Sequence, residues 1–267
     1  MTDPHLWPRL SVSDALAPGV HVVLTPEADH YLRRVLRRGP GDDVRLFNER
    51  DGEVHARLAL VPSGSARGKR AATAALEVVA VLRPPEKPPC PEIWLYAAPL
   101  KKAHVDFLVM KATELGIAHL QLILTDRTQV QGLGLAHLQA VALEAAEQSE
   151  RLSIPTIHAS LPLRQVVETW PADRLPLVCA EIGPARPVAE ALQPWATLGD
   201  RAPLPPSLAL FTGPEGGFTL GELQRLAALP NVLVLRLGAR ILRAETAALT
   251  ALACWQMFCG EGRAPVA

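Results

Sequence analysis

A glycine-rich segment follows an apolar run in the last quarter of the chain. It reads Phe211-Thr212-Gly213-Pro214-Glu215-Gly216-Gly217-Phe218-Thr219, and the apolar residues before it predict a strand. Thr219 and Glu222 have the spacing of a capping box, which predicts that a helix begins there. Glycines at the carboxyl end of a strand let a ligand lie against bare backbone groups. An ordinary tight turn between a strand and a helix would also account for these glycines.

A second segment repeats this arrangement, with a strand end, a glycine and a helix start. It reads Leu237-Gly238-Ala239-Arg240-Ile241-Leu242-Arg243-Ala244-Glu245-Thr246-Ala247. Arg240, Arg243 and Glu245 crowd the point where the chain leaves the strand, although a solvated helix start would also use such charges. Two such turns at the same end of one sheet favour a binding crevice. The glycines of the first turn do not have the spacing of a nicotinamide-dinucleotide fingerprint or of a P-loop.

Two further segments place polar residues near helix ends. In Glu144-Ala145-Ala146-Glu147-Gln148-Ser149-Glu150-Arg151, positions 144, 147, 148 and 151 share one helix face, which is also common on solvated helices. The segment Lys111-Ala112-Thr113-Glu114-Leu115-Gly116 predicts a helix end with a glycine cap.

The elements that must hold these turns predict an α/β domain. Apolar strands alternate with longer helices, which favours a mainly parallel sheet with helices on both faces. We expect strands at Ile93–Ala97, Leu120–Thr125, Leu177–Glu181, Leu208–Thr212 and Val232–Leu237. We expect helices at about 103–115, 135–150, 219–228 and 244–259, and a surface loop at Gln193–Ser207, which contains four prolines.

The first eighty residues predict a different, strand-rich domain. The β-favouring runs are Val20–Leu24, Asp43–Phe47, Val54–Leu60 and Leu76–Leu82, with a short basic helix at about Asp29 to Arg38 and a hairpin tip at Pro62–Gly68. Arg83–Pro91 holds five prolines in nine residues, which is typical of a stiff linker. We therefore expect two domains, at residues 1–83 and 90–267.

Composition excludes several classes of protein. The 267-residue chain is 49% hydrophobic with a net charge of zero, so it can form a sizeable core and its overall charge gives no argument for nucleic acid. However, His30–Arg38 holds four arginines and no acid, which predicts an RNA-binding surface. A helix surface that aids solubility or pairs with Asp29 and Asp42 is the alternative, and a GC-rich genome would explain why the basic residues are mostly arginine.

Cysteine and histidine spacing argue against disulfides and metal. Cys90, Cys179, Cys254 and Cys259 form no C-x-x-C motif, and no two histidines have H-x-x-x-H spacing. No apolar run approaches the roughly 20 residues of a membrane span, and the first residues do not resemble a signal peptide. We therefore expect a soluble cytoplasmic protein without a metal ion.

Together, these segments resemble a bacterial family, the ribosomal RNA small subunit methyltransferase E family, which methylates N3 of a uridine in 16S ribosomal RNA. The resemblance covers nearly the whole chain, and its most specific blocks are the two glycine-containing turns. Three positions depart from the family pattern: Ala239 replaces a usual proline, Glu150 a usual glycine and Asp126 a usual glutamate. The other matching segments are Pro8-Arg9, His30–Asp42, Leu46-Phe47, Lys101–Gly116, Thr125–Arg127 and Glu144–Ser149.

The resemblance implies a SPOUT-type methyltransferase domain with a trefoil knot, an N-terminal PUA-like β-barrel for RNA, and a homodimer. It implies S-adenosylmethionine as the methyl donor and 16S ribosomal RNA, or the small ribosomal subunit, as the partner. The expected donor-binding residues are Gly213, Glu215, Gly216, Gly217, Leu237, Gly238, Leu242 and Thr246. The expected RNA-binding residues are Arg9, Arg33, Arg34, Arg37, Lys101 and Lys102.

Strand-end placement and the resemblance together suggest the catalytic groups. Uracil N3 is protonated at neutral pH, so a cation near O2 or O4 would favour the reactive anion. We expect Arg243 to have this role, with Glu245 orienting it or acting as base, and Arg127 as the second cation. The alternatives are a non-catalytic ribosome-assembly factor and a related enzyme that modifies a ribose 2′-OH or a tRNA base.

Overall fold

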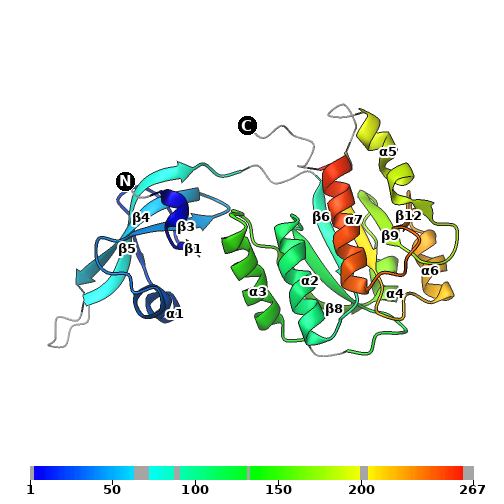
Figure 1. Cartoon of the computed structure of the whole chain (residues 1–267), viewed down its shortest axis with the longest axis horizontal. Helices are drawn as coiled ribbons and strands as arrows, with labels where there is room; N and C mark the ends of the chain where they lie inside the picture. The colour runs from blue at the N-terminus through cyan, green and yellow to red at the C-terminus, as the bar shows by residue number, and fades with distance from the viewer. Residues whose placement is uncertain (1–2, 63–71, 87–90, 131–132, 199–203, 261–267) are drawn as a thin grey trace. The chain divides into compact units, whose positions relative to one another are not determined.

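The computed structural model describes residues 3–62, 72–86, 91–130, 133–198 and 204–260 (Figure 1). The chain forms two compact units. The first comprises Met1–Lys87 together with Glu150–Ser153, and the second comprises Pro88–Ser149 and Ile154–Ala267. The expected hairpin tip at Pro62–Gly68 lies almost entirely outside the described residues, as does part of the expected linker at Arg83–Pro91.

The first unit is built on a five-stranded sheet in the order β1-β3-β4-β5-β2. Its strands are β1 (Arg9–Ser11), β2 (His21–Val23), β3 (Asp43–Asn48), β4 (Gly52–Pro62) and β5 (Ala72–Arg83). All four strands expected from the sequence are present, and β1 is an addition of three residues that pairs in parallel with β3. Alternate apolar residues of these strands, among them Val44, Leu46, Val54 and Leu76, form the core of this unit.

One helical segment covers this small core. It consists of α1 (Pro26–His30), which Thr25 caps, followed by one π-helical stretch over Tyr31–Val35. Leu32 is fully buried, whereas the arginines beside it face outward. The expected basic helix is therefore present, but it begins earlier than the sequence suggested because Thr25 and Pro26 provide the start signals.

A buried ionic network links the tetrapeptide Glu150–Ser153 to this unit. Arg9 donates a 2.6 Å hydrogen bond to the Glu53 carboxylate and another to the carbonyl oxygen of Arg151. Arg45 lies 2.7 Å from the Glu150 carboxylate, and this contact lowers the pKa of Glu150 to about 2. Glu150 has a φ of 59°, in the left-handed region that favours glycine, which accounts for the glycine of the family pattern.

The second unit contains a seven-stranded sheet in the order β10-β12-β9-β11-β6-β7-β8, in which every neighbouring pair is parallel. The strands are β6 (Glu92–Ala97), β7 (His119–Leu124), β8 (Thr156–Pro162), β9 (Arg174–Cys179), β10 (Arg186–Pro187), β11 (Ser207–Thr212) and β12 (Leu233–Arg236). β11 is buried at every position, as expected of a central strand covered on both faces. The predicted α/β architecture is confirmed.

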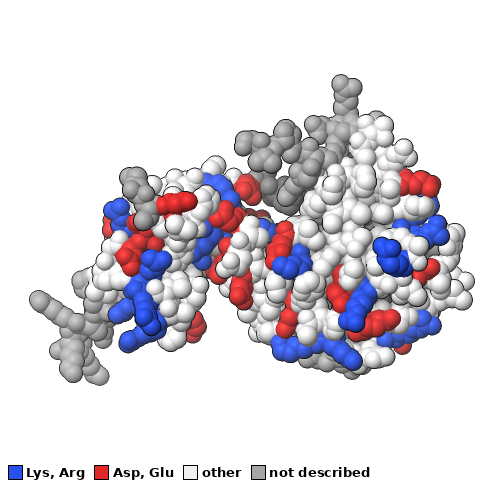
Figure 2. All heavy atoms as spheres, viewed as in Figure 1, with Lys and Arg blue, Asp and Glu red and all other residues white. Residues whose placement is uncertain are grey.

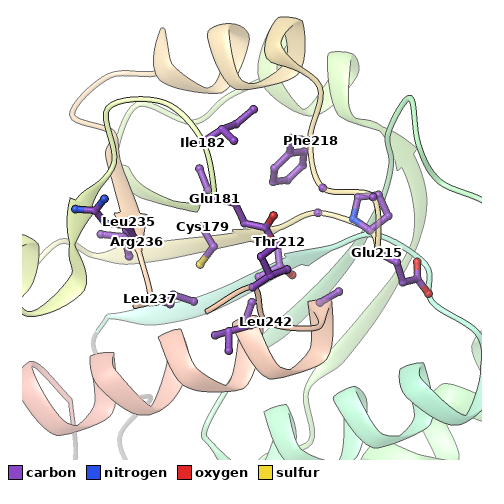
Figure 3. A pocket seen from close by; sticks show the side chains of 18 of the residues that line it. Cys179, Glu181, Ile182, Thr212, Glu215, Phe218, Leu235, Arg236, Leu237 and Leu242 are labelled. Carbon is purple, nitrogen blue, oxygen red and sulfur yellow. The ribbon is translucent and has the colours of Figure 1, made fainter. Parts of the chain in front are cut away.

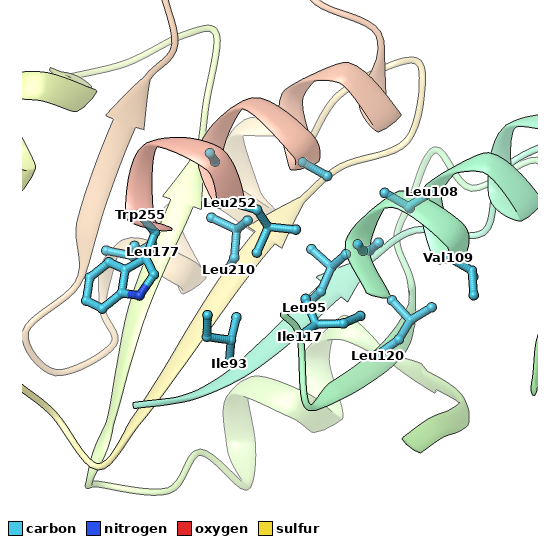
Figure 4. Close-up of a cluster of buried hydrophobic side chains, with 14 of the residues drawn as sticks. Ile93, Leu95, Leu108, Val109, Ile117, Leu120, Leu177, Leu210, Leu252 and Trp255 are labelled. Atoms are coloured by element: carbon cyan, nitrogen blue, oxygen red, sulfur yellow. The ribbon is translucent and has the colours of Figure 1, made fainter. Parts of the chain in front are cut away.

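Helices cover both faces of this sheet (Figure 1). One face packs against α2 (Lys102–Glu114), α3 (Leu135–Gln148), α5 (Val188–Leu198) and α7 (Ala244–Phe258). The other packs against α4 (Leu163–Glu168) and α6 (Leu220–Ala227). Figure 4 shows the larger core, where Leu252 and Trp255 of α7 lie over Leu177 and Leu210 of the sheet. This packing fixes the start of α7 relative to the strand ends.

Four elements, β8, β10, α4 and α5, were not predicted from the sequence. The predicted surface loop at Gln193–Ser207 is wrong over residues 193–198. Those residues continue α5, in which Pro194 lies inside the helix. Pro194 is exposed, while Leu192 is buried and Trp195 packs 6.1 Å from Trp255 of α7. Apolar packing therefore outweighs the helix-breaking tendency of the proline.

The chain crosses over itself in a way that brings separate segments together. β11 and β12 follow one another in sequence, but β9 lies between them in the sheet. The carboxyl ends of β9, β11 and β12 therefore meet at one edge. None of the helices in the described ranges is long and apolar enough to cross a bilayer.

Candidate functional site

A cavity of about 400 Å³ opens at the carboxyl ends of β9, β11 and β12 (Figure 3). Its size falls in the range of small-molecule sites, and its position is where open parallel sheets bind ligands. The two glycine-containing turns form much of its wall. Seven of the eight expected donor-binding residues line it: Gly213, Glu215, Gly216, Gly217, Leu237, Gly238 and Leu242.

The first turn requires glycine for two physical reasons. A Cβ at Gly213 would lie 3.1 Å from the backbone nitrogen of Phe218, so a side chain there would need the turn to open by a few tenths of an ångström. Gly217 has a φ of 67°, and a Cβ there would meet nothing within 4 Å. The space in front of Gly217 therefore remains available to a ligand.

The helix that follows this turn is fixed by its cap. Thr219 and Glu222 form the predicted capping box at the start of α6, and Glu222 is 2% exposed. The Glu222 carboxylate also accepts a 2.8 Å hydrogen bond from the backbone nitrogen of Asp126. The Thr219 hydroxyl donates to the Asp126 carboxylate at 3.0 Å. These bonds join the segment after β7 to the glycine turn, and Asp126 makes them although the family pattern has glutamate here.

Arg127 continues the same connection and lines the cavity. Its guanidinium donates a 2.6 Å hydrogen bond to the carbonyl oxygen of Gly216. Its Cδ lies 3.2 Å from the point that a Cβ at Gly216 would occupy. The absence of a side chain at Gly216 therefore lets Arg127 lie across the turn.

The second turn follows β12 and leads into α7. Gly238 has a φ of 128°, which L-residues rarely adopt, so the chain reverses at this position. Leu237 and Leu242 line the cavity, and Ala244 and Ala247 of α7 complete this side. The small α7 residues leave room for a ligand against the helix start.

A third segment that was not expected from the sequence, Cys179–Ile182 at the end of β9, also lines the cavity. The signal was present, because a strand was expected at Leu177–Glu181 and its carboxyl end had to meet the other two. Burial raises the pKa of Cys179 to about 12, so the thiol stays protonated at neutral pH. Cys179 therefore contributes shape rather than a nucleophile.

The expected catalytic residues occupy different surroundings. Arg127 lines the cavity, whereas Arg243 and Glu245 do not. Thr246, the eighth expected donor-binding residue, does not line it either. Arg243 is the exposed residue at the N-cap of α7. Glu245 is 7% exposed and lies 2.8 Å from Nδ1 of His104 on α2, a partner that the sequence did not suggest.

The expected RNA-binding arginines also separate into groups. Arg34 and Arg37 are exposed, and Arg33 is exposed while pairing with Asp29 at 3.3 Å. Figure 2 shows basic side chains gathered over the α1 region, where these residues lie. Arg9 is a correction, because it is 7% exposed and stacks 3.6 Å from the Phe47 ring centroid. A buried, paired Arg9 is not available to a phosphate.

The two expected lysines lie at the start of α2. Lys101 is the N-cap residue and is exposed. Lys102 is also exposed and pairs with Asp106 at 2.8 Å.

Comparison with known proteins connects this geometry with a family. Residues 86–256 match the RNA methyltransferase domain family, and residues 24–69 match the RNA methyltransferase PUA domain family. The chain is 30% identical to ribosomal RNA small subunit methyltransferase E of Rickettsia conorii, over 92% of this chain and 93% of that protein. It is 34% identical to the protein of the same name from Synechocystis, over 92% of this chain and 76% of that protein.

Solved structures agree with these sequence matches. A methyltransferase from Legionella pneumophila in complex with S-adenosylmethionine superimposes with a TM-score of 0.79 at 27% identity, covering 96% of this chain and 99% of that one. Ribosomal RNA small subunit methyltransferase E from Neisseria gonorrhoeae, bound to S-adenosylmethionine, gives 0.76 at 27% identity with the same coverage. The predicted α/β unit and PUA-like unit are thus shared with these proteins, and the chain belongs to the ribosomal RNA small subunit methyltransferase E family.

Proposed function

We propose that this protein transfers the methyl group of S-adenosylmethionine to N3 of a uridine in 16S ribosomal RNA. The observation that carries the proposal is the cavity between the turns Gly213–Gly217 and Leu237–Leu242, in a chain of this family. Its volume suits a nucleoside-sized ligand, and the open space before Gly217 exposes backbone groups to it. Glu181 and Glu215 also line the cavity and suit the positive charge of the donor.

The donor, when bound, supplies an electrophilic methyl group on its sulfonium. The protein must present uracil N3 to it as the anion, in line with the bond that breaks. We assign Arg243 to stabilise the negative charge that develops on the uracil oxygens, because it is exposed at the start of α7. The target base must leave its stack to reach this position.

Of the two roles considered for Glu245, orientation suits its surroundings better. Its carboxylate is buried against His104 and does not line the cavity. This contact fixes the second residue of α7 to α2, and thereby positions Arg243 two residues earlier in the chain. Arg127, through its bond to Gly216, holds the donor turn in shape in addition to its proposed electrostatic role.

We further propose that the first unit binds RNA through Arg33, Arg34 and Arg37. Lys101 and Lys102 of the second unit make additional contacts with the RNA. A homodimer, a knotted connection and a cytoplasmic location belong to the same proposal, as does catalysis without a metal ion. Among the described residues, no group of three acidic, histidine or cysteine side chains is arranged to hold one.

One experiment tests the central claim. Purified protein is incubated with S-adenosylmethionine and either 16S RNA lacking the modification or unmodified small subunits, and the nucleosides are analysed by mass spectrometry. We expect N3-methyluridine. A 2′-O-methylated nucleoside or a methylated tRNA base would identify the related enzyme instead. Absence of donor binding in calorimetry would identify the non-catalytic assembly factor.

A further inference from the structure

Two arginines at the cavity have no role in the proposed reaction. Arg236 is the last residue of β12, and Arg240 lies in the turn that follows. Both are exposed and both line the cavity. Within the described part of the chain, neither side chain makes a hydrogen bond or an ion pair. Their charges are therefore uncompensated.

Several other arginines of this unit are held by partners, although the exposed Arg225 and Arg243 have none among the described residues. Arg164 pairs with Glu168 at 2.6 Å, and Arg186 pairs with Glu190 at 3.1 Å. Arg174 donates to the Tyr96 hydroxyl at 2.5 Å and lies 3.9 Å from the Trp94 ring centroid. Arg236 and Arg240 differ from Arg225 and Arg243 because they line the cavity, where a bound ligand can be their partner.

The methyl donor is a poor candidate for that ligand. It carries a sulfonium and an ammonium against one carboxylate, so two uncompensated arginines would repel it overall. The acidic residues Glu181 and Glu215 of the cavity suit those cationic groups better. Figure 3 shows Glu215 and Arg236 on opposite sides of the cavity. Arg236 and Arg240, which are exposed, are instead suited to bind an anion at the mouth of the cavity.

We propose that Arg236 and Arg240 bind phosphate groups of the RNA strand next to the target nucleotide. This inference rests on the proposed function, because it assigns the anion to the RNA substrate. Guanidinium groups bind phosphate through paired hydrogen bonds, and such contacts fix the register of a strand without reading its sequence. Phosphates held at the rim would keep the extruded uridine directed into the cavity.

The test compares two full-length double variants of equal charge, Arg236→Ala/Arg240→Ala and Arg164→Ala/Arg186→Ala. The second pair is exposed and ion-paired in the same unit, so its loss costs little stability. Binding to a 16S RNA transcript is measured between about 50 and 200 mM salt, and donor affinity by calorimetry. We expect the log–log salt slope of the first variant to fall by about 1.4 to 1.8, for two phosphates at roughly 0.7 to 0.9 each. Its donor affinity should stay within twofold of wild type, and the control should keep the wild-type slope.

Two results would overturn the inference. An unchanged salt slope in Arg236→Ala/Arg240→Ala would mean that these arginines do not contact RNA. A tenfold loss of donor affinity with an unchanged slope would instead assign them to the donor carboxylate. Failure of the proposed function looks different: wild-type protein would form no N3-methyluridine on 16S RNA. A reduced slope in the variant would then still support the phosphate contacts.

Discussion

Arg127 and Gly216 are 89 residues apart in sequence, yet the guanidinium of the first donates to the carbonyl oxygen of the second at 2.6 Å. The same side chain passes 3.2 Å from the position of a Cβ at Gly216. The hydrogen bond and the close approach make the two positions interdependent. A side chain at position 216 would make Arg127 shift, and the hydrogen bond from Arg127 supports the shape of the glycine turn.

The first prediction is a double-mutant cycle on this pair. Gly216→Ala and Arg127→Ala should each weaken donor binding, the first by displacing Arg127 and the second by releasing the turn. The double variant should be little worse than either single variant, with a coupling of about 1 kcal/mol in donor affinity. Gly221→Ala is the control, because a Cβ at this helical position meets nothing within 4 Å. Additive effects would show that the two residues act independently.

Gly217→Val tests whether the open space before this glycine is the donor site. A side chain there should abolish donor binding in calorimetry, because it would occupy the ligand's position. Its positive φ adds strain of roughly 1 to 2 kcal/mol, so thermal unfolding is measured in parallel. Gly19→Val carries similar strain, at a φ of 86°, in the other unit, and Gly19 does not line the cavity. Wild-type donor affinity in folded Gly217→Val would refute the assignment.

Arg243→Ala should reduce turnover about a hundredfold while donor affinity changes little, because its proposed partner is the charge developing on uracil. Single-turnover methylation and calorimetry measure the two quantities separately. Arg225→Ala, on the exposed side of α6, controls for loss of one positive charge. If turnover and donor affinity fall in parallel, Arg243 belongs to the donor site instead.

Replacing Arg33, Arg34 and Arg37 with alanine should weaken RNA binding and flatten its salt dependence. The expected loss of slope is at most about 2 to 3, since three phosphate contacts contribute roughly 0.7 to 0.9 each. The Arg33 share should be the smallest, because Asp29 already neutralises it in part. Arg50→Ala/Arg57→Ala, which removes two acid-paired arginines from the same unit, is the control. A salt slope equal to wild type would show that this surface does not contact RNA.

His158 should make stability depend on pH. Burial, together with the nearby His119 and Arg174, lowers its pKa below the usual 6.5. The unfolded chain therefore binds the proton more readily, so stability is full above about pH 6.5 and is lost as the pH falls towards the folded-state pKa. Urea unfolding at several pH values measures this slope, which His158→Gln should reduce. An identical slope in the variant would assign the acid sensitivity to other groups.

Much of the second unit followed from local patterns in the sequence. The strands β6, β7, β9, β11 and β12 are apolar runs bounded by turn residues. Among the helices, α6 begins with a capping box and α2 ends beside Gly116. α5 was not predicted because its stability comes from Leu192 and Trp195, which pack against the core. The local helix propensity of a sequence does not include such tertiary contacts. β8 has one buried residue among seven, and α4 has only six residues, so both gave weak periodic signals.

The parts of the site that depend on backbone conformation could be predicted from the sequence. The parts that depend on contacts between distant side chains could not. The glycines of both turns are visible in the sequence, because a positive φ or a tight turn restricts which residue can occupy the position. The Glu245–His104 pair and the burial of Arg9 arise from contacts between segments more than 40 residues apart, so no local pattern contains them.

The tetrapeptide Glu150–Ser153 has a practical consequence for dissecting this protein. These four residues lie between α3 and β8 of the second unit in sequence but belong to the first unit. They supply hydrogen-bond acceptors for Arg9 and Arg45. A fragment that stops at the proline-rich segment would therefore lack part of its own interior, with two buried guanidinium groups deprived of an acceptor. A single protease cut in that segment would still leave two covalent connections between the halves. Expression of the RNA-binding unit by itself will need those four residues supplied, for example by a grafted loop.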